Sequence, residues 1–315
     1  MQSGHWLTIL TNFWPRPLDL SKLPALDSVY ETEPGVRVLV REHHPPCAEV
    51  KGEILLVHGL EGSADSGYMR SFAHYGAMTG WRVHRTNIRT CGPTENWCRT
   101  LYHAGLTTDI KFIARTLAAQ GRGPIFIVGY SLGGNQVLNA VAELCVESPG
   151  VIAGVCAVST PIQLAPCSRK IEEPANFIYM NRFLASMKKR MKRRAEAMPG
   201  AFSLEGLDDV RTIYEIDDKI TAPHFGFGTA DNYYATQSAV VRLGQVNIPV
   251  LMVAAEDDPI VPISCYDHPA MKSNSNVTFN RMRRGGHVSF LARGDSRFWL
   301  DHFLLDWLES KRVID

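Results

Sequence analysis

The chain has 315 residues, of which 45% are hydrophobic and 21% are charged, and its formal net charge is +1. These values indicate an ordinary soluble globular protein with a large core, in one large domain or two. A net charge so close to zero gives no electrostatic reason to expect nucleic acid or an anionic membrane as a partner.

The seven cysteines are scattered along the chain, are odd in number and contain no C-x-x-C pair. We therefore expect neither structural disulfides nor a zinc site, and we expect a reducing compartment. The first 17 residues lack a charged leader region, and the apolar run at 6–10 is too short to span a membrane. These features predict a cytoplasmic protein without an integral membrane segment.

Residues 1–30 carry aromatic side chains at Trp6, Phe13 and Trp14, among prolines at positions 15, 17 and 24. This composition favours an extended N-terminal arm packed on the outside of a domain. A role as an interfacial anchor, which would give weak peripheral membrane contact, is the alternative.

From residue 36 onward, short apolar runs alternate with segments of helical periodicity. Continuous apolar runs are typical of strands buried on both faces of a mainly parallel sheet. We predict strands at 36–40, 54–57, 81–84, 124–130, 151–158, 249–255 and 277–279. We predict helices at 68–79, at 106–120, directly after residue 131, at 231–243 and at 298–308.

A serine lies at the junction between one of these strands and the helix that follows it, in the sequence Gly129-Tyr-Ser131-Leu-Gly133. A serine at such a sharp turn takes a strained backbone, and flanking glycines let the strand and the helix approach each other. The N-terminus of the helix would stabilise negative charge that develops beside the serine. The motif therefore predicts a nucleophile elbow with Ser131 as the nucleophile.

A serine nucleophile needs a base to take its proton, and the base needs a carboxylate to orient it. In elbow folds the serine, the acid and the histidine follow one another in that order along the chain. Asp258 ends a predicted strand directly before Pro259, and His287 lies in a Gly-Gly loop after the next strand. We therefore predict a triad of Ser131, Asp258 and His287, with Asp257 as the rival acid.

The loop His58-Gly-Leu60-Glu-Gly62 follows a buried apolar run and is the second predicted part of the active site, beside the triad. Elbow folds make an oxyanion hole from the N–H after the nucleophile and an N–H of such an earlier loop. We therefore expect the backbone N–H groups of Leu60 and Leu132 to form it. His58 itself is expected to hydrogen-bond its own loop rather than to act in catalysis.

The regular alternation breaks at 161–230, where the pattern becomes helical and irregular. An insertion at the sheet edge that carries the serine would cover the site as a lid. Phe183 and Met187 in this segment are candidate substrate contacts, and His103 in a polar loop either lines the pocket mouth or satisfies buried carbonyls. The basic run 188–194 could attract anionic lipid or acyl-CoA, but a solvated helix face is favoured.

Several motifs, taken in order, resemble the YheT-like branch of the α/β-hydrolase fold superfamily. They are His58-Gly-Leu-Glu-Gly-Ser63, Asn87-Ile-Arg-Thr-Cys-Gly92, Leu101-Tyr-His-Ala-Gly105, Gly129-Tyr-Ser-Leu-Gly-Gly-Asn135, Phe225-Gly-Phe227 with Tyr233-Tyr234, Asp257-Asp-Pro259 and Gly285-Gly-His287. The resemblance covers about residues 30–310 and implies an acyl-ester hydrolase, with relatives that act on medium or long acyl chains and some that transfer the acyl group to alcohols. One departure is Thr90, where the branch more often has glycine.

We therefore expect an α/β-hydrolase core at 31–160 and 231–315, with helices on both faces of a mostly parallel sheet, an N-terminal arm at 1–30 and a helical lid at 161–230. The leading interpretation is a carboxylesterase-type serine hydrolase (EC 3.1.1.-) that cleaves a small-molecule acyl ester through an acyl-enzyme intermediate. The alternatives are an acyltransferase that uses an alcohol, and a non-catalytic binding protein with the same fold. No cofactor or metal is expected. The acyl-chain length, the alcohol and the oligomeric state stay open.

Overall fold

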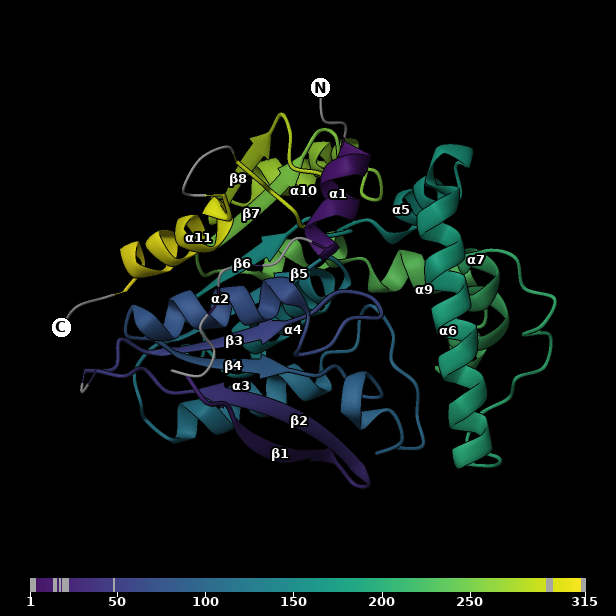
Figure 1. The fold of residues 1–315 in the computed structure, drawn as a ribbon, viewed down its shortest axis with the longest axis horizontal. Helices are drawn as coiled ribbons and strands as arrows, with labels where there is room; N and C mark the ends of the chain where they lie inside the picture. Colours follow the sequence, from purple (N-terminus) through teal and green to yellow (C-terminus); the bar gives the residue numbers. More distant parts are fainter. Residues whose placement is uncertain are drawn as a thin grey trace.

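The computed structural model describes residues 4–13, 16, 18, 23–47, 49–292 and 297–312. In this part of the chain eight strands form one sheet in the order β1-β2-β4-β3-β5-β6-β7-β8 (Figure 1). The strands are β1 (Leu26–Glu33), β2 (Val36–His43), β3 (Glu53–Val57), β4 (Arg82–Thr86), β5 (Ile125–Tyr130), β6 (Gly154–Val158), β7 (Val250–Ala255) and β8 (Val277–Met282). The helices are α1 (Gly4–Phe13), α2 (Gly67–Met78), α3 (Thr108–Ala119), α4 (Leu132–Glu147), α5 (Leu164–Ile171), α6 (Phe177–Ala197), α7 (Ile213–Ile216), α8 (Ala222–His224), α9 (Ala230–Gln237), α10 (Pro269–Ser273) and α11 (Trp299–Ser310).

The sheet is parallel from β4 through β8, and only β1 and β2 pair antiparallel with their neighbours. Parallel strands bring their carboxyl ends to the same edge of a sheet. The loops that follow β3, β5, β7 and β8 therefore meet at one edge. This confirms the mostly parallel sheet predicted from the apolar runs.

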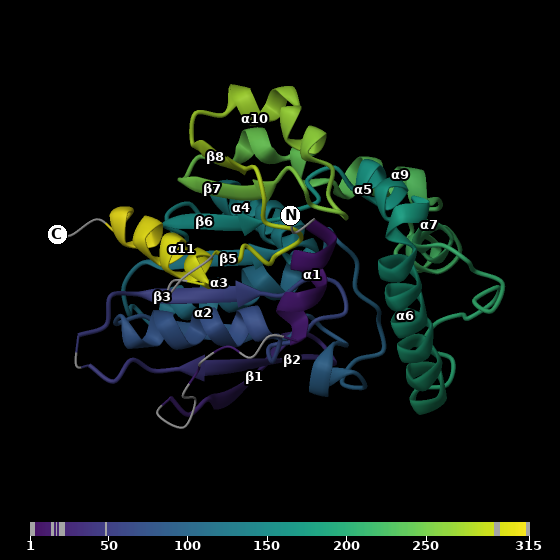
Figure 2. The ribbon, with the colours of Figure 1, turned by 45° about the horizontal axis from the view of Figure 1, so that its top comes forward.

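Side chains of the central strands are buried alternately on the two faces of the sheet. In β3, Leu55 and Val57 join a core cluster with α3 and α4, whereas Ile54 and Leu56 join a cluster with α2 and α11. Figure 2 shows α2 and α11 on the face of the sheet opposite α3 and α4. Because helices cover both faces, these strands are continuously apolar, as the sequence pattern predicts.

The N-terminal region differs from the expected extended arm, which is wrong for residues 4–13. These residues form helix α1, in which Leu7 is buried. The prolines that suggested an extended chain begin at position 15, after the helix has ended, so they do not interrupt it. Trp14, Pro15 and Pro17 lie outside the described residues. Farther on, 26–33 pairs with β2 as the edge strand β1, which the sequence pattern did not indicate.

The connection between β6 and β7 contains α5 to α9 and is largely helical, as its sequence pattern predicts. Helix α6 stands beyond the carboxyl ends of the parallel strands (Figure 1, right). Its residues Leu184, Met187 and Met191 pack in a small core that also contains Val210 and Ile216. This segment therefore has apolar packing of its own beside the sheet edge where the loops meet.

We predict that the fold loses stability in mild acid, because several buried histidines have lowered pKa values, His43 and His103 among them. Burial, reinforced by Arg85, lowers the pKa of His43 to about 4, and burial lowers the pKa of His103 to about 3. An unfolded chain takes these protons near pH 6.5. The stabilisation is therefore complete above pH 6.5 and is lost as the pH falls toward 4.

We expect the free energy of unfolding to drop by about 2 kcal/mol for each such histidine between pH 7 and pH 5, measured by urea denaturation. The variant His43→Gln should show a shallower pH dependence than the unmodified protein. His44→Gln, at the exposed neighbouring position, is the matched control. The same pH dependence in both variants would contradict the assignment to His43.

Candidate active site

Ser131 occupies a strained turn between β5 and α4. Its φ is +52°, a left-handed conformation that non-glycine residues rarely adopt. The turn is also tightly packed, because a Cβ at Gly133 would lie 2.2 Å from the carbonyl oxygen of His58, and a Cβ at Gly129 would lie 2.6 Å from the Cα of Gly134. These glycines let the strand, the helix and the loop after β3 meet around Ser131.

The three side chains predicted as a triad lie in hydrogen-bond contact. Oγ of Ser131 is 2.8 Å from Nε2 of His287, and Nδ1 of His287 is 2.9 Å from Oδ2 of Asp258. Asp258 follows β7, and its Oδ1 also accepts hydrogen bonds from the backbone N–H groups of Ile260 and Val261. The carboxylate is buried and fixed, and it faces the imidazole nitrogen remote from the serine.

The neighbouring carboxylate of Asp257 has a different set of contacts. Its Oδ1 accepts hydrogen bonds from the backbone N–H groups of Gly285 at 2.8 Å and Gly286 at 2.9 Å. Asp257 and Asp258 both lie in the turn after β7, and of the two carboxylates it is Asp258 that contacts the imidazole. Asp257 instead holds the loop that carries His287.

Helix α1 packs directly on that loop. The backbone N–H of His287 donates to Oγ1 of Thr8 at 2.8 Å, and the Oγ atoms of Thr11 and Ser289 are 2.7 Å apart. The loop is strained, because Val288 has a positive φ of 62°. A loop in this conformation needs external contacts to stay in place, and α1 supplies two of them.

The loop after β3 is held by buried polar contacts. Nδ1 of His58 donates to the carbonyl oxygen of Gly59 at 2.8 Å, and its Nε2 accepts from the backbone N–H of Ile88 at 3.0 Å. Burial lowers the pKa of this imidazole to about 4. His58 therefore hydrogen-bonds its own loop, as expected. The Tyr68 hydroxyl of α2 accepts from the N–H of Gly59 at 3.0 Å.

The two predicted oxyanion donors lie on either side of Ser131. Leu132 is the first residue of α4, where a backbone N–H has no acceptor within its helix. Within the described residues, the N–H of Leu60 has no hydrogen-bond acceptor either. Both residues border a small cavity of about 60 Å³. Two N–H groups are thus left available near the nucleophile.

Next to Leu60, the carboxylate of Glu61 accepts hydrogen bonds from two residues of α6. Nη2 of Arg190 is 2.7 Å from Oε1, and Oγ of Ser186 is 2.6 Å from Oε2. The Arg190 guanidinium lies 4.9 Å from the ring centroid of Tyr102. The side chains of Arg190 and Glu61 are only 8% and 9% exposed, so this ion pair is poorly screened by solvent. It ties α6 to the loop after β3.

Thr90, the departure from the related proteins' motif, lies in the same cluster. Its φ is +67°, which is the conformation that glycine adopts without strain. The threonine hydroxyl accepts a hydrogen bond from Nη1 of Arg190 at 3.1 Å. The side chain thus adds an acceptor for Arg190 at a position where glycine would relieve backbone strain.

The basic run 188–194 is a solvated face only in part: Lys189, Lys192 and Arg193 are exposed, as the favoured interpretation expects, but two of its arginines are not. Arg190 and Arg194 are buried, and Arg194 donates to the carbonyl oxygens of residues 95, 98 and 100. Lys188 donates to the carbonyl oxygens of residues 208 and 210. The physical reason is that backbone carbonyls of neighbouring loops need donors, which these long side chains supply. The run therefore fastens α6 to the core.

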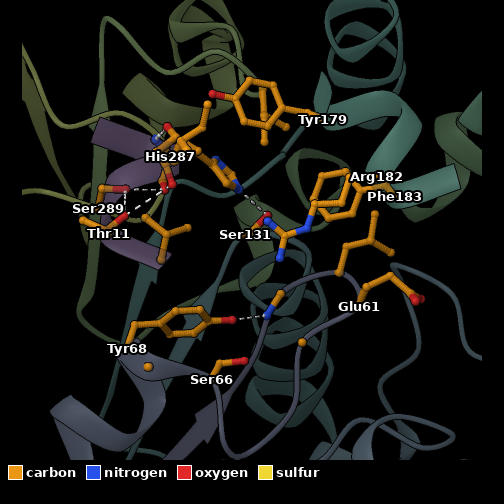
Figure 3. A pocket seen from close by; sticks show the side chains of 18 of the residues that line it. Thr11, Glu61, Ser66, Tyr68, Ser131, Tyr179, Arg182, Phe183, His287 and Ser289 are labelled. Carbon is orange, nitrogen blue, oxygen red and sulfur yellow. Dashed lines mark hydrogen bonds between the residues drawn. The ribbon is translucent and has the colours of Figure 1, made fainter. Parts of the chain in front are cut away.

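A pocket of about 700 Å³ opens at Ser131 (Figure 3). Its lining includes Ser131, His287 and, from α6, Tyr179 and Phe183. Of the three candidate substrate contacts, only Phe183 lines this pocket. Met187 and His103 line the smaller cavity instead. Their side chains are buried there in apolar surroundings.

Sequence reasoning missed Glu61, Arg190, Tyr68 and Thr8. Glu61 was part of a quoted motif, but nothing in the sequence indicated its partner on a helix 129 residues away. Thr8 had no local signal, since its role depends on the packing of α1 against the His287 loop. The sequence held one signal, Thr90. A position that usually holds glycine indicates a backbone with positive φ, which the structure has there.

Among the described residues, no group of three or more histidine, cysteine or carboxylate side chains is arranged to hold a metal ion. None of the helices in the described ranges is both long enough and apolar enough to cross a bilayer.

The chain matches the α/β hydrolase fold family over residues 53–293. It is 31% identical to the YheT protein of Escherichia coli strain K12, over 86% of this chain and 81% of that protein. It is 27% identical to phospholipase ABHD3 of Mus musculus, over 78% of this chain and 59% of that protein. A soluble variant of monoglyceride lipase from Saccharomyces cerevisiae, solved with a substrate analog, superposes with a TM-score of 0.62 at 15% identity, over 96% of this chain and all of that one. The chain therefore belongs to the α/β-hydrolase fold family, in its YheT-like branch.

Proposed function

We propose that the protein is a carboxylesterase-type serine hydrolase with Ser131, His287 and Asp258 as its catalytic residues. The observation that carries the proposal is the unbroken series of hydrogen bonds from Oγ of Ser131 through His287 to Asp258, at the base of a pocket of about 700 Å³. The names of two similar proteins, a phospholipase and a monoglyceride lipase, support an ester as the bond cleaved.

In the proposed mechanism the Oγ of Ser131 attacks the ester carbonyl carbon, and Nε2 of His287 takes the hydroxyl proton. Asp258 accepts a hydrogen bond from Nδ1 and stabilises the imidazolium that forms. The imidazolium then gives its proton to the leaving alcohol, which departs as the C–O bond breaks. The acyl group stays on Ser131 as an ester.

Water completes the reaction in the same site. His287 takes a proton from the water as it attacks the acyl-enzyme, and Ser131 leaves with that proton while the carboxylic acid is released. In both steps the carbonyl oxygen becomes negatively charged. The free N–H groups of Leu60 and Leu132 are the donors that we assign to it, and the N-terminal dipole of α4 adds to their effect.

The variant Ser131→Ala should abolish ester turnover, measured with p-nitrophenyl esters, while the melting temperature changes little because the hydroxyl contributes no core packing. An organophosphonate probe should label the unmodified protein at Ser131 and leave the variant unlabelled. A folded Ser131→Ala protein that keeps more than a small fraction of the activity would contradict the proposal.

The two neighbouring carboxylates give a matched pair of variants. Asp258→Asn should lower kcat by about 10⁴-fold, since an amide disturbs the tautomer of the histidine. Asp257→Asn should have a far smaller effect, because the amide oxygen can still accept the hydrogen bonds of Gly285 and Gly286. If Asp257→Asn were the more damaged variant, the assignment of the acid would be reversed.

We further propose that 161–230 acts as a lid that provides the acyl pocket, above a core at 31–160 and 231–315. Helix α6 is anchored on both sides of the pocket: the Tyr179 hydroxyl donates to the carbonyl oxygen of His5 in α1 at 3.2 Å, and Arg190 pairs with Glu61. Phe183, between these anchors, and Ile178, directly before the first of them, place apolar side chains along the pocket. Each methylene of an acyl chain buried there gains about 0.8 kcal/mol.

The test compares Phe183→Ala with Phe177→Ala, the same substitution on an exposed part of α6 that does not line the pocket. We expect kcat/KM of the unmodified protein to rise several-fold for every two carbons of acyl chain until the pocket ends. Phe183→Ala should flatten this increase, and Phe177→Ala should preserve it. Identical chain-length profiles in the two variants would exclude α6 as the acyl-binding wall.

A further inference from the structure

Three arginines line the pocket that contains Ser131, namely Arg16, Arg70 and Arg182. Among the lining residues that the structure describes, Glu61 is the one carboxylate, and it is already paired with Arg190. The free charge around the pocket is therefore positive. A cleft with walls of one charge sign concentrates ligands of the opposite sign.

Arg182 differs from the other arginines on the same helix. Arg190 pairs with Glu61 and Arg193 pairs with Glu95, whereas Arg182 has no carboxylate and no hydrogen-bond acceptor within the described part of the chain. It lies between Ile178 and Phe183 on the face of α6 that borders the pocket. Figure 3 shows its guanidinium directed toward the middle of the pocket, in the direction of Ser131.

The other two cations lie on the opposite, α2 side. Arg16 is held by Asp301 at 3.3 Å and stacks over the ring of Phe298 at 4.2 Å, so much of its charge is already engaged. Arg70 is exposed and has no ion-pair partner among the residues that the structure describes. Arg16 and Arg70 add positive potential, and of the two arginines without an ion-pair partner among the described residues, Arg182 is the one whose guanidinium is directed toward Ser131.

We propose that the substrate is an ester that carries an anionic group, a carboxylate or a phosphate, bound by Arg182 while Ser131 attacks the ester carbonyl. This inference depends on the proposed esterase function and specifies its substrate class. A guanidinium binds either anion through two parallel hydrogen bonds, which are stronger than bonds between neutral groups. The anion is retained on the product acid or alcohol, so the reaction remains an ordinary ester hydrolysis.

The experiment uses ester pairs that differ only in the anion. p-Nitrophenyl hexanoate is compared with the p-nitrophenyl monoester of adipic acid, which replaces the terminal methyl group by a carboxylate. Monohexanoylglycerol is compared with monohexanoylglycerol phosphate, which places a phosphate on the alcohol side. We expect kcat/KM to favour the anionic member of at least one pair by roughly 10-fold at low salt, and less at high salt. The pair that shows the preference identifies the anion.

Variants assign the preference to Arg182. Arg182→Gln should reduce the ratio of anionic to neutral kcat/KM to about one, and Arg182→Lys should keep part of it. Lys189→Gln, which removes an exposed charge from the same helix outside the pocket, should leave the ratio unchanged.

The outcomes separate this inference from the proposed function. If neither the neutral nor the anionic esters are cleaved, the esterase proposal fails. If the neutral esters are cleaved and neither anionic partner is preferred, the function stands and the anionic site is refuted. A preference that survives in Arg182→Gln but is lost in Arg70→Gln would also overturn the assignment to Arg182.

Discussion

The site depends on how closely the backbone of α4 approaches the loop after β3. At Gly133 there is no room for a single carbon atom beyond Cα, because the carbonyl oxygen of His58 occupies that space. This contact brings the start of a helix, where the N–H of Leu132 is free, next to a loop in which the N–H of Leu60 has no acceptor among the described residues. The strand, the helix and the loop pack closely together here, and the backbone at Ser131 takes a strained, positive φ.

Around that contact, the loop 58–62 is held by three other parts of the chain, at sequence separations of 9, 30 and 129 residues. Tyr68 of α2 bonds the N–H of Gly59, Ile88 donates to His58, and Arg190 of α6 pairs with Glu61. Preorganised donors stabilise a developing charge best when they need not move during the reaction. The insertion between β6 and β7 thus contributes to the rigidity of the loop beneath it as well as to the wall of the pocket.

The sequence predicted what depends on local patterns. The continuous apolar runs gave the parallel sheet, since both faces of β3 to β7 are buried, and the glycines around Ser131 gave the elbow. Asp258 was chosen over Asp257 by its place directly before Pro259, and the two carboxylates do have different partners, the imidazole of His287 and the backbone of Gly285. Which residues line the pocket was predicted poorly, because Phe183 and Met187 lie one turn apart on the same helix yet border different cavities.

Interactions between distant segments could not be predicted from one sequence. In the sequence, an arginine-rich run on an amphipathic helix resembles a solvated face. The acceptors of Arg194 are backbone carbonyls, which have no sequence signature, so the burial of this side chain could not be predicted. Strand β1 was missed because its edge position leaves most of its residues exposed, so the apolar pattern is weak. Helix α1 was missed because prolines beyond its end dominated the local composition.

The hydrogen bond between Thr8 and His287 joins residues separated by 279 positions. During synthesis, Thr8 therefore leaves the ribosome long before His287 has been added to the chain. The backbone N–H of His287 is the donor in this hydrogen bond. The histidine loop, with its left-handed backbone at Val288, has no preference of its own for the conformation that reaches Ser131. A nascent polypeptide that has not reached residue 287 consequently has the serine without its base, and reactivity toward esters would begin only after helix α1 and the His287 loop have met.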